Sequence, residues 1–209
     1  MLRERERIAS DMHDDLGAGL SGLKLRSEMA LRVEQDPVKR EQLASLAATA
    51  GELIGSMRQM IWALDREQAS LEDLLVYATS YARTYCDHHG LALTIDIAPD
   101  LPQAELTTEQ RRSLFLIMKE ALHNTVKHAR AGRFTITVRW SDGLLLTLAD
   151  DGLGLPAATE HGTGNGMRNM RRRITALGGS MELRAERGTA IHLRLPLRAG
   201  TNLRSIATA

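Results

Sequence analysis

The sequence lacks several features that would assign it to a specialised class of protein. It has one cysteine, Cys86, in 209 residues, which excludes an intramolecular disulfide and suits a reducing compartment. No apolar run approaches the roughly 18 residues that a membrane-spanning helix needs, and the first ten residues, MLRERERIAS, contain no apolar signal region. The net charge of +1 gives no electrostatic footprint for nucleic acid. These absences predict a cytoplasmic protein, and 43% hydrophobic residues are enough for an ordinary core.

The N-terminal third predicts a helical hairpin. Proline is absent from residues 2 to 34, and Asp36-Pro37 then interrupts a helical pattern that resumes beyond it. The apolar positions are Ile8, Met12, Leu16, Leu20 and Leu23 before the break, and Leu43, Leu46, Ala47, Ala50, Leu53, Ile54, Met57, Ile61 and Leu64 after it. We expect two antiparallel amphipathic helices. Because a lone hairpin leaves apolar surface in water, we expect two chains to form a four-helix bundle, which implies a homodimer.

The rest of the chain predicts a second unit of helices and strands after a polar linker at residues 67 to 70. Ser70 is the expected N-cap of its first helix, and Ser-Asp-Gly at 141 to 143 is a hairpin turn signal. Helices are expected at 70–86, 108–129 and 167–177, and strands at 91–97, 134–140, 144–149, 181–185 and 190–195. This pattern predicts an α/β sandwich, with a long glycine-rich loop at 151 to 166 whose length calls for a function.

Two glycine motifs flank this loop. In Asp150-Asp151-Gly152-Leu153-Gly154, a carboxylate at a strand end can accept a hydrogen bond from a base amino group while the glycines let the backbone approach a ligand. A glycine turn with solvated aspartates explains the motif equally well. Gly162-Thr-Gly164-Asn-Gly166 opens a helix, whose backbone N–H groups suit a phosphate. It is not a P-loop, because no Gly-Lys-Ser/Thr follows, and no strand precedes it as in a Rossmann fingerprint.

A polar constellation lies on the helix expected at 108 to 129. Glu120, Asn124, Lys127 and His128 are spaced four, three and one, so they project from one side. An amide oxygen can ligate Mg²⁺ and a lysine can contact phosphate. A solvated face is the common alternative, but most of this helix is apolar, which favours a polar ligand.

His13 lies in the stretch DMHDDLGAGLSGLKL, at the edge of the first apolar stripe. An adjacent carboxylate could hold one ring nitrogen and raise the nucleophilicity of the other. Taken alone, a surface histidine is the commoner explanation.

Four motifs in order change that assessment. They are His13-Asp14-Asp15-Leu16-Gly17, Glu120…Asn124…Lys127-His128, Asp150-x-Gly152-x-Gly154 and Gly164-x-Gly166. Together they resemble a bacterial sensor histidine kinase, of the subfamily paired with response regulators that carry a LuxR/NarL-type DNA-binding domain. The stretch ERERIASDMHDDLG matches the Glu/Arg-rich start and the His-Asp-x-Leu-Gly motif of that subfamily. The resemblance covers about residues 3 to 197.

The resemblance implies two domains and a flexible tail. Residues 1 to 66 would form a dimerisation and histidine-phosphotransfer hairpin. Residues 71 to 197 would form an ATP-binding domain of the GHKL (Bergerat) type, shared with gyrase-like ATPases and Hsp90, and residues 198 to 209 the tail. His13 would attack the γ-phosphate of ATP, with Asp14 as the base, and pass the phosphoryl group to an aspartate of the regulator.

The resemblance also implies roles in binding ATP and Mg²⁺. Asn124 would ligate Mg²⁺, and Glu120 would serve a catalytic water or the metal. The nucleotide would be contacted by Lys127 and His128 at the phosphates or ribose, Asp150 at the adenine amino group, Gly152 and Gly154 around that pocket, Gly164 and Gly166 at the phosphates, and Thr189 near the adenine. Residues 155 to 165 would be a mobile ATP lid.

The chain departs from the subfamily at Ala18. Many members carry a glutamine there, which is thought to orient the water that dephosphorylates the regulator, so we expect weak phosphatase activity.

We expect Gly17 and Gly22 to keep the surface near His13 low enough for docking. The chain would be the cytosolic portion of a membrane-anchored sensor or a soluble kinase served by a partner. Two alternatives stay open: an ATPase or serine kinase of the same fold, such as an anti-sigma-factor kinase, and a non-catalytic dimerisation and nucleotide-sensing module.

Overall fold

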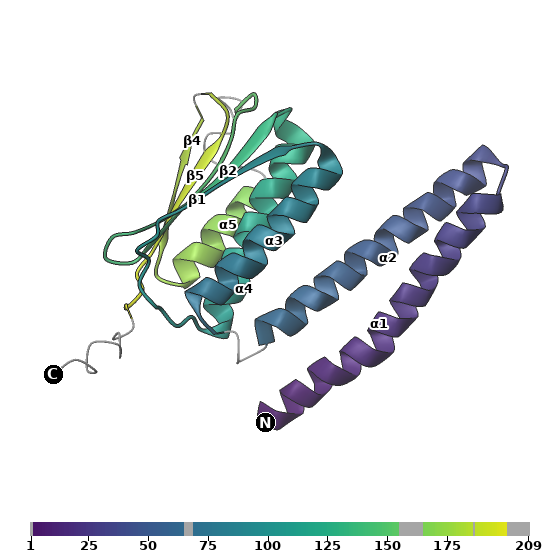
Figure 1. The fold of residues 1–209 in the computed structure, drawn as a ribbon, viewed down its shortest axis with the longest axis horizontal. Coiled ribbons are helices and arrows are strands. Elements are labelled where there is room, and N and C mark those ends of the chain that lie inside the picture. Colours follow the sequence, from purple (N-terminus) through teal and green to yellow (C-terminus); the bar gives the residue numbers. More distant parts are fainter. Residues whose placement is uncertain (1, 65–68, 155–164, 186, 200–209) are drawn as a thin grey trace. The chain divides into compact units, whose positions relative to one another are not determined.

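The computed structural model describes residues 2–64, 69–154, 165–185 and 187–199 (Figure 1). For residues 2–16, 52, 56 and 58–64 it describes the backbone alone. The chain divides into two compact units, Met1–Glu67 and Gln68–Ala209. None of the helices in the described ranges is both long and apolar enough to span a membrane.

The first unit is the expected helical hairpin, formed by α1 (Leu2–Val33) and α2 (Pro37–Leu64). Proline suits the first position of α2, where a backbone N–H would have no helical partner. Asp36 caps the helix, since its Oδ1 accepts the N–H of Val38 at 2.9 Å. The connection is fastened by Arg40, whose Nη1 donates to the carbonyl oxygens of Leu31 and Glu34, both at 2.9 Å.

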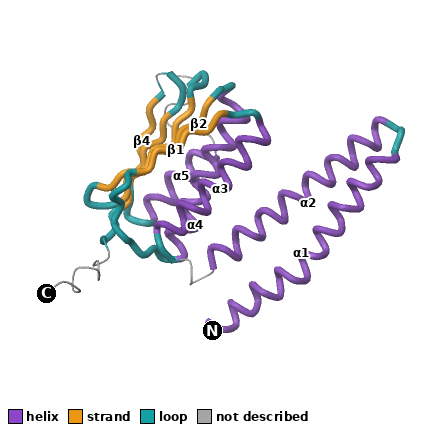
Figure 2. The backbone as a smooth tube through the Cα atoms, in the orientation of Figure 1, coloured by secondary structure: helices purple, strands orange, loops and turns teal. Residues whose placement is uncertain are grey.

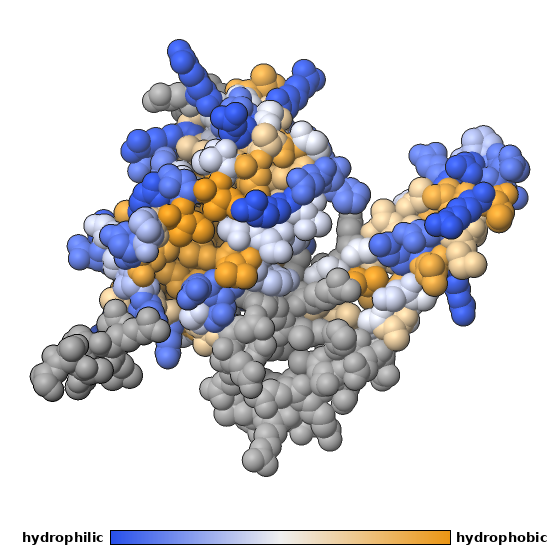
Figure 3. Space-filling model, viewed as in Figure 1, coloured by the Kyte–Doolittle hydropathy of each residue, from blue (hydrophilic) through white to orange (hydrophobic). Residues whose placement is uncertain are grey.

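Most of the buried side chains that the structure describes in the hairpin are small. Ser27, Ala47 and Ala50 are buried there, and a Cβ added at Gly17 would lie 2.9 Å from Cε of Met57. Larger apolar side chains stay exposed in the single chain, namely Leu23, Leu25, Met29, Val33, Val38, Leu46 and Leu53. Figure 3 shows apolar side chains between hydrophilic ones along the described part of the hairpin. Among the described side chains of the hairpin, Met57 is therefore buried with the small residues, while several other large apolar residues stay uncovered.

The second unit is a two-layer α/β sandwich, as expected. Its five-stranded sheet has the order β1-β2-β3-β5-β4, with β1 and β2 parallel and the other neighbours antiparallel. The strands are β1 (Ala92–Ile97), β2 (Arg133–Trp140), β3 (Leu144–Asp150), β4 (Ser180–Arg184) and β5 (Ala190–Leu195). The helices α3 (Leu71–His89), α4 (Thr108–Asn124) and α5 (Asn165–Ala176) cover one face of the sheet (Figures 1 and 2). Alternate residues of β2 and β3 are buried.

Capping residues set the beginnings of α3 and α4. Ser70 is the N-cap of α3 as predicted, and Asp73 completes a capping box with it. Thr107 and Gln110 form the same arrangement at the start of α4. At its end α3 runs on to His89, beyond the Cys86 predicted from sequence, and stops at Gly90, which has a φ of 65°.

The helix expected at 108 to 129 differs from the prediction in its last turn. The α-helix ends at Asn124, and Thr125–Ala129 continue as a π-helical turn, η1. This wider turn is held from outside, because the carbonyl oxygen of Ala129 accepts the N–H of Leu153 at 2.8 Å. Turns of this kind are frequent at functional sites.

Candidate functional site

Asp150 lies at the end of β3 and is held by three donors from three segments. Its Oδ1 accepts the backbone N–H of Gly152 at 3.0 Å and that of Thr189 at 3.2 Å. Its Oδ2 lies 3.4 Å from the hydroxyl of Thr125. The half-buried carboxylate is thus fixed in orientation. A side chain that recognises a ligand through hydrogen bonds needs such a fixed orientation.

Glycines let three backbone segments meet around this carboxylate. A Cβ at Gly188 would overlap the carbonyl oxygen of Asp150, and one at Gly152 would overlap that of Ala129. Gly188 and Gly154 also have φ values of 90° and 73°, which disfavour any side chain. Gly152 and Gly154 therefore let backbone segments approach closely beside Asp150, and their role around a nucleotide stays a prediction.

Asp151 has a different task from its neighbour. Its Oδ1 accepts the N–H groups of Gly132 and Arg133, both at 2.8 Å. These backbone hydrogen bonds, the one from Arg133 first, lower the pKa of the Asp151 carboxyl. Asp151 therefore joins the start of β2 to the end of β3.

The π-turn brings the polar constellation to this end of the sheet. Asn124 is half-buried at the end of α4, and Lys127 and His128 are exposed on the turn. Thr125 at its start lies beside Asp150, and Ala129 at its end bonds to Leu153. Asn124, Lys127 and His128 are thus carried by a segment fastened at both ends to the Asp150–Gly154 loop.

Glu120 lies against the first turn of α5. A Cβ at Gly166 would overlap its Oε1, so a side chain at position 166 would require the Glu120 carboxylate to move. Glu120 also lines a hollow of about 200 Å³ between α4 and α5, together with Leu116, Lys119, His123, Asn169, Met170 and Arg173. The structure therefore brings together Glu120 and Gly166, which sequence placed in two separate motifs.

Other predicted site residues are not joined to this cluster by the described structure. His13 and Asp14 lie in α1 of the first unit, where the backbone alone is described. Gly164 and residues 155–164 of the expected lid lie outside the described residues. Asn165, the last residue of that lid, instead begins α5.

Sequence reasoning missed two residues of the site. Thr125 is buried, and its hydroxyl lies beside Asp150. The sequence feature that could have identified it is a polar residue directly after Asn124 on an otherwise apolar helix. Gly188 was passed over in favour of Thr189, although a Gly-Thr pair before a strand can mark a close backbone approach.

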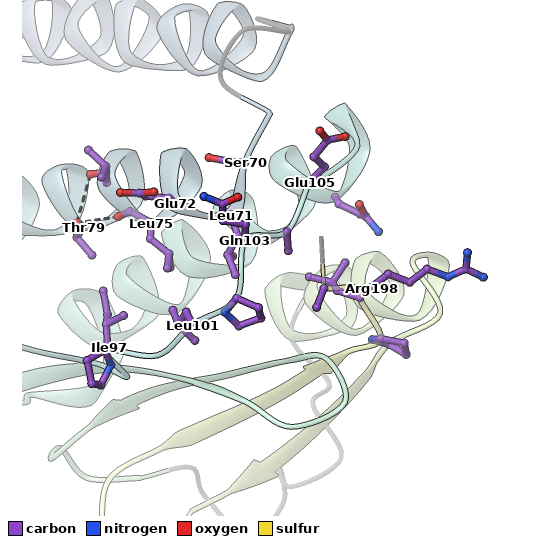
Figure 4. A pocket seen from close by; sticks show the side chains of 18 residues that line it. Ser70, Leu71, Glu72, Leu75, Thr79, Ile97, Leu101, Gln103, Glu105 and Arg198 are labelled. Atoms are coloured by element: carbon purple, nitrogen blue, oxygen red, sulfur yellow. Dashed lines mark hydrogen bonds between the residues drawn. The ribbon is translucent and has the colours of Figure 1, made fainter. Parts of the chain in front are cut away.

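A wide groove lies at the opposite end of the sheet from Asp150 (Figure 4). It has a volume of about 1200 Å³, and its walls include Leu75 and Thr79 of α3, Ile97 at the end of β1, and Leu101. None of the predicted site residues lines it, so its size does not make it the candidate site.

The residues present fit the ATP and Mg²⁺ that the sequence resemblance implies. Both backbone N–H groups bond to Oδ1 of Asp150, so Oδ2 can accept a hydrogen bond from a ligand. The glycines leave room for the backbone to approach a ligand closely. In the described part of the chain no three His, Cys, Asp or Glu side chains cluster as a metal site. Mg²⁺ needs none, because it keeps waters and binds mainly through phosphate oxygens and one or two protein ligands, a place that Asn124 can fill.

Comparison with known proteins identifies the families to which the two parts of the chain are similar. A family model described as "Histidine kinase" matches residues 4–69, and one described as "Histidine kinase-, DNA gyrase B-, and HSP90-like ATPase" matches residues 109–199. The chain is 29% identical over 197 residues to the signal transduction histidine-protein kinase/phosphatase UhpB of Salmonella typhimurium, covering 93% of this chain and 39% of UhpB. It is 27% identical over 199 residues to the sensor histidine kinase DesK of Bacillus subtilis, covering 93% of this chain and 51% of DesK.

Solved structures share the fold. The histidine kinase domain of the blue-light activated kinase EL346 from Erythrobacter litoralis superposes with a TM-score of 0.56 at 16% identity, over 86% of this chain and 94% of that one. Full-length ShkA in complex with AMPPNP gives 0.58 at 16% identity, over 94% of this chain and 47% of ShkA. With the two domain matches in order along one chain, this protein belongs to the sensor histidine kinases and carries their catalytic core.

Proposed function

We propose that this chain uses ATP to phosphorylate its own His13 and then transfers the phosphoryl group to an aspartate of a response regulator. The regulator would carry a LuxR/NarL-type DNA-binding domain, as in the subfamily that the sequence resembles. The observation that carries the proposal is the Asp150 carboxylate, which two backbone amides orient beside the turn that bears Asn124, Lys127 and His128.

In the proposed reaction an imidazole nitrogen of His13 attacks the γ-phosphorus. A P–N bond forms, the bond from that phosphorus to the β,γ-bridging oxygen breaks, and ADP leaves. The imidazole proton passes to Asp14. Mg²⁺, held through Asn124, would supply charge neutralisation at the phosphates. Positioning does the remaining work, because phosphoryl transfer needs in-line geometry more than covalent help.

The other residues keep the proposed roles. Asp150 accepts a hydrogen bond from the adenine amino group, and Thr189 contributes its backbone N–H to holding that carboxylate. Glu120 acts on a catalytic water or the metal, while Lys127, His128, Gly164 and Gly166 contact or border the phosphates. The hairpin of residues 1–66 and the ATP-binding domain of residues 71–197 are the two proposed domains, joined in sequence by the linker at 67–70.

Labelling with γ-labelled ATP tests this function. Label that is stable to base and lost in acid marks a phosphohistidine and supports the proposal. Acid-stable label would indicate a serine kinase of the same fold, and the absence of label would indicate a nucleotide-sensing module; either would contradict it. Adding candidate regulators to the labelled protein then identifies the partner by transfer of the label.

We also propose that two chains dimerise through the hairpin as a four-helix bundle. Replacing both Leu46 and Leu53 with glutamate is expected to raise the dimer dissociation constant by at least about a hundredfold, because two charges from each chain, four in all, would have to be buried in the bundle. Both side chains are about half exposed in the single chain. Analytical ultracentrifugation measures the change, and Ala48→Glu, at another exposed position of α2, is the control. A wild-type chain that is monomeric at micromolar concentration contradicts the proposal.

Weak phosphatase activity is the proposed consequence of Ala18, an exposed residue of α1 that cannot hold a water by hydrogen bonding. Ala18→Gln is expected to speed dephosphorylation of the regulator by about tenfold or more, since a positioned polar side chain can assist attack by water. The measurement is the loss of label from the phosphorylated regulator, with Ser21→Gln, also exposed on α1, as the control. Rapid dephosphorylation by the wild-type chain that does not need His13 would show the expectation to be wrong.

A further inference from the structure

Thr125 is a buried threonine at the junction between α4 and the π-turn. Its side chain is almost wholly inside the unit, at 3% exposure. Its hydroxyl lies 3.0 Å from the carbonyl oxygen of Ala121 and 3.4 Å from Oδ2 of Asp150. A hydroxyl has one proton, so the two oxygens share it, and the carboxylate is the stronger acceptor.

The donors around Asp150 leave little of the carboxylate open. An ionised carboxylate offers about four acceptor positions, two on each oxygen. The N–H groups of Gly152 and Thr189 fill both positions on Oδ1, and the Thr125 hydroxyl lies 3.4 Å from Oδ2 while it also contacts the nearer carbonyl oxygen of Ala121. The capacity of the Asp150 carboxylate to accept a further hydrogen bond is therefore at Oδ2.

We infer that Thr125 is a positioning residue that orients Oδ2 of Asp150 toward the base and so sets the preference for a purine that bears an amino group at C6. An adenine offers a donor N–H to this oxygen. A hypoxanthine presents a carbonyl oxygen in the same place, and the two acceptors face each other without a proton. The inference rests on the proposed ATP site and adds a residue to it.

Removal of the Thr125 hydroxyl should act on binding of the base and leave the phosphate end in place. The backbone N–H of Thr125 bonds to the carbonyl oxygens of Ala121 and Leu122, which keeps the end of α4 and Asn124 fixed. Thr125→Val keeps the shape of the side chain and removes only the hydroxyl. The variant should therefore bind nucleotide less tightly while its rate at saturating ATP is unchanged.

Calorimetric titration of the full chain with Mg·ADP and with Mg·IDP tests this inference. In Thr125→Val the Kd for ADP should rise about tenfold, as expected for a hydrogen bond to a charged group, while the Kd for IDP should change by less than about twofold. Thr125→Ser keeps the hydroxyl and should restore ADP binding. Thr79→Val is the matched control, because the Thr79 hydroxyl makes the same bond to a helical carbonyl, that of Leu75 at 2.7 Å, away from the site.

Three results would overturn the inference: Thr125→Val binding ADP as the wild type does, an equal loss of ADP and IDP binding, or a serine variant no better than valine. A fall in the autophosphorylation rate at saturating ATP would also count against a role in positioning the base. If the wild-type chain binds neither nucleotide, the proposed function fails and this inference fails with it. The first three results leave wild-type ADP binding intact, so the two failures can be told apart.

Discussion

Gly188→Ala is expected to destabilise the second unit by about 3 kcal/mol or more and to remove nucleotide binding. The added Cβ would overlap the carbonyl oxygen of Asp150 and lie 3.0 Å from Cα of Asp151. The backbone at Gly188 has a φ of 90°, where a side chain is strained even without a neighbour. Since both contacts are with backbone, neither can be relieved by a side-chain rotation, and the end of β3 must shift. Calorimetry should show a fall in Tm of about 10 °C.

Gly178→Ala is the matched control for this prediction. Gly178 has a similar φ of 76°, but a Cβ there would have no atom within 4 Å. The free energy of unfolding of Gly178→Ala should fall by only about 1 kcal/mol, from the unfavourable backbone conformation alone. This variant should bind ADP normally. If the two variants unfold at the same temperature, the close approach of Gly188 to Asp150 is not part of the folded protein.

The elements of the fold were predictable because most depend on local pattern. The periods of apolar residues and the capping signal at Ser70 identified the helices and strands. The order β1-β2-β3-β5-β4 and the parallel pairing of β1 with β2 were not predictable, since they join segments far apart in sequence. The π-turn was also missed, because the hydrogen bond from Leu153 to Ala129 that holds it comes from outside the helix.

The hairpin shows where apolar pattern misleads. Hydrophobicity favours leucine over alanine for the interior, yet Ala47 and Ala50 are buried while Leu46 is 50% exposed. Small residues allow two helices to approach closely, and this choice depends on the partner helix rather than on the stripe itself. A Cβ at Gly17 would lie 2.9 Å from the end of the flexible Met57 side chain, and docking clearance at Gly17 remains a prediction. Gly22 has open space around it, so docking clearance remains a prediction for that position.

At the candidate site, the sequence indicated residue types and the chemistry they allow, but it did not indicate which of those residues contact one another. Asp150 and Asp151 are the same residue type at adjacent positions, and only the structure shows that Asp151 joins β2 to β3 while Asp150 accepts the N–H groups of Gly152 and Thr189. Glu120 and Gly166 lie 46 positions apart in the sequence, and the contact between them depends on how α5 packs on α4. Residue type and spacing carry no information on such contacts.

His13→Gln is expected to abolish labelling from γ-labelled ATP, because glutamine cannot supply a nitrogen nucleophile for phosphoryl transfer. ADP binding should be unchanged, since Asp150 and the glycines around it belong to a unit that is compact without the hairpin. The expected pattern is therefore loss of label with an unaltered Kd for ADP. A general loss of folding would reduce both together.

The control for His13→Gln is His88→Gln, which changes an exposed histidine of α3 outside the site and should leave labelling at the wild-type level. Measurable acid-labile label on His13→Gln would place the phosphoryl group on another histidine and contradict the proposed mechanism. Because His123 and His128 lie near the proposed nucleotide site, peptide mapping of any remaining label would show whether one of them is phosphorylated instead. If the chain is labelled only when His13 is present, His13 is the nucleophile. Neither the spacing of residues on α1 nor the described backbone can make this assignment.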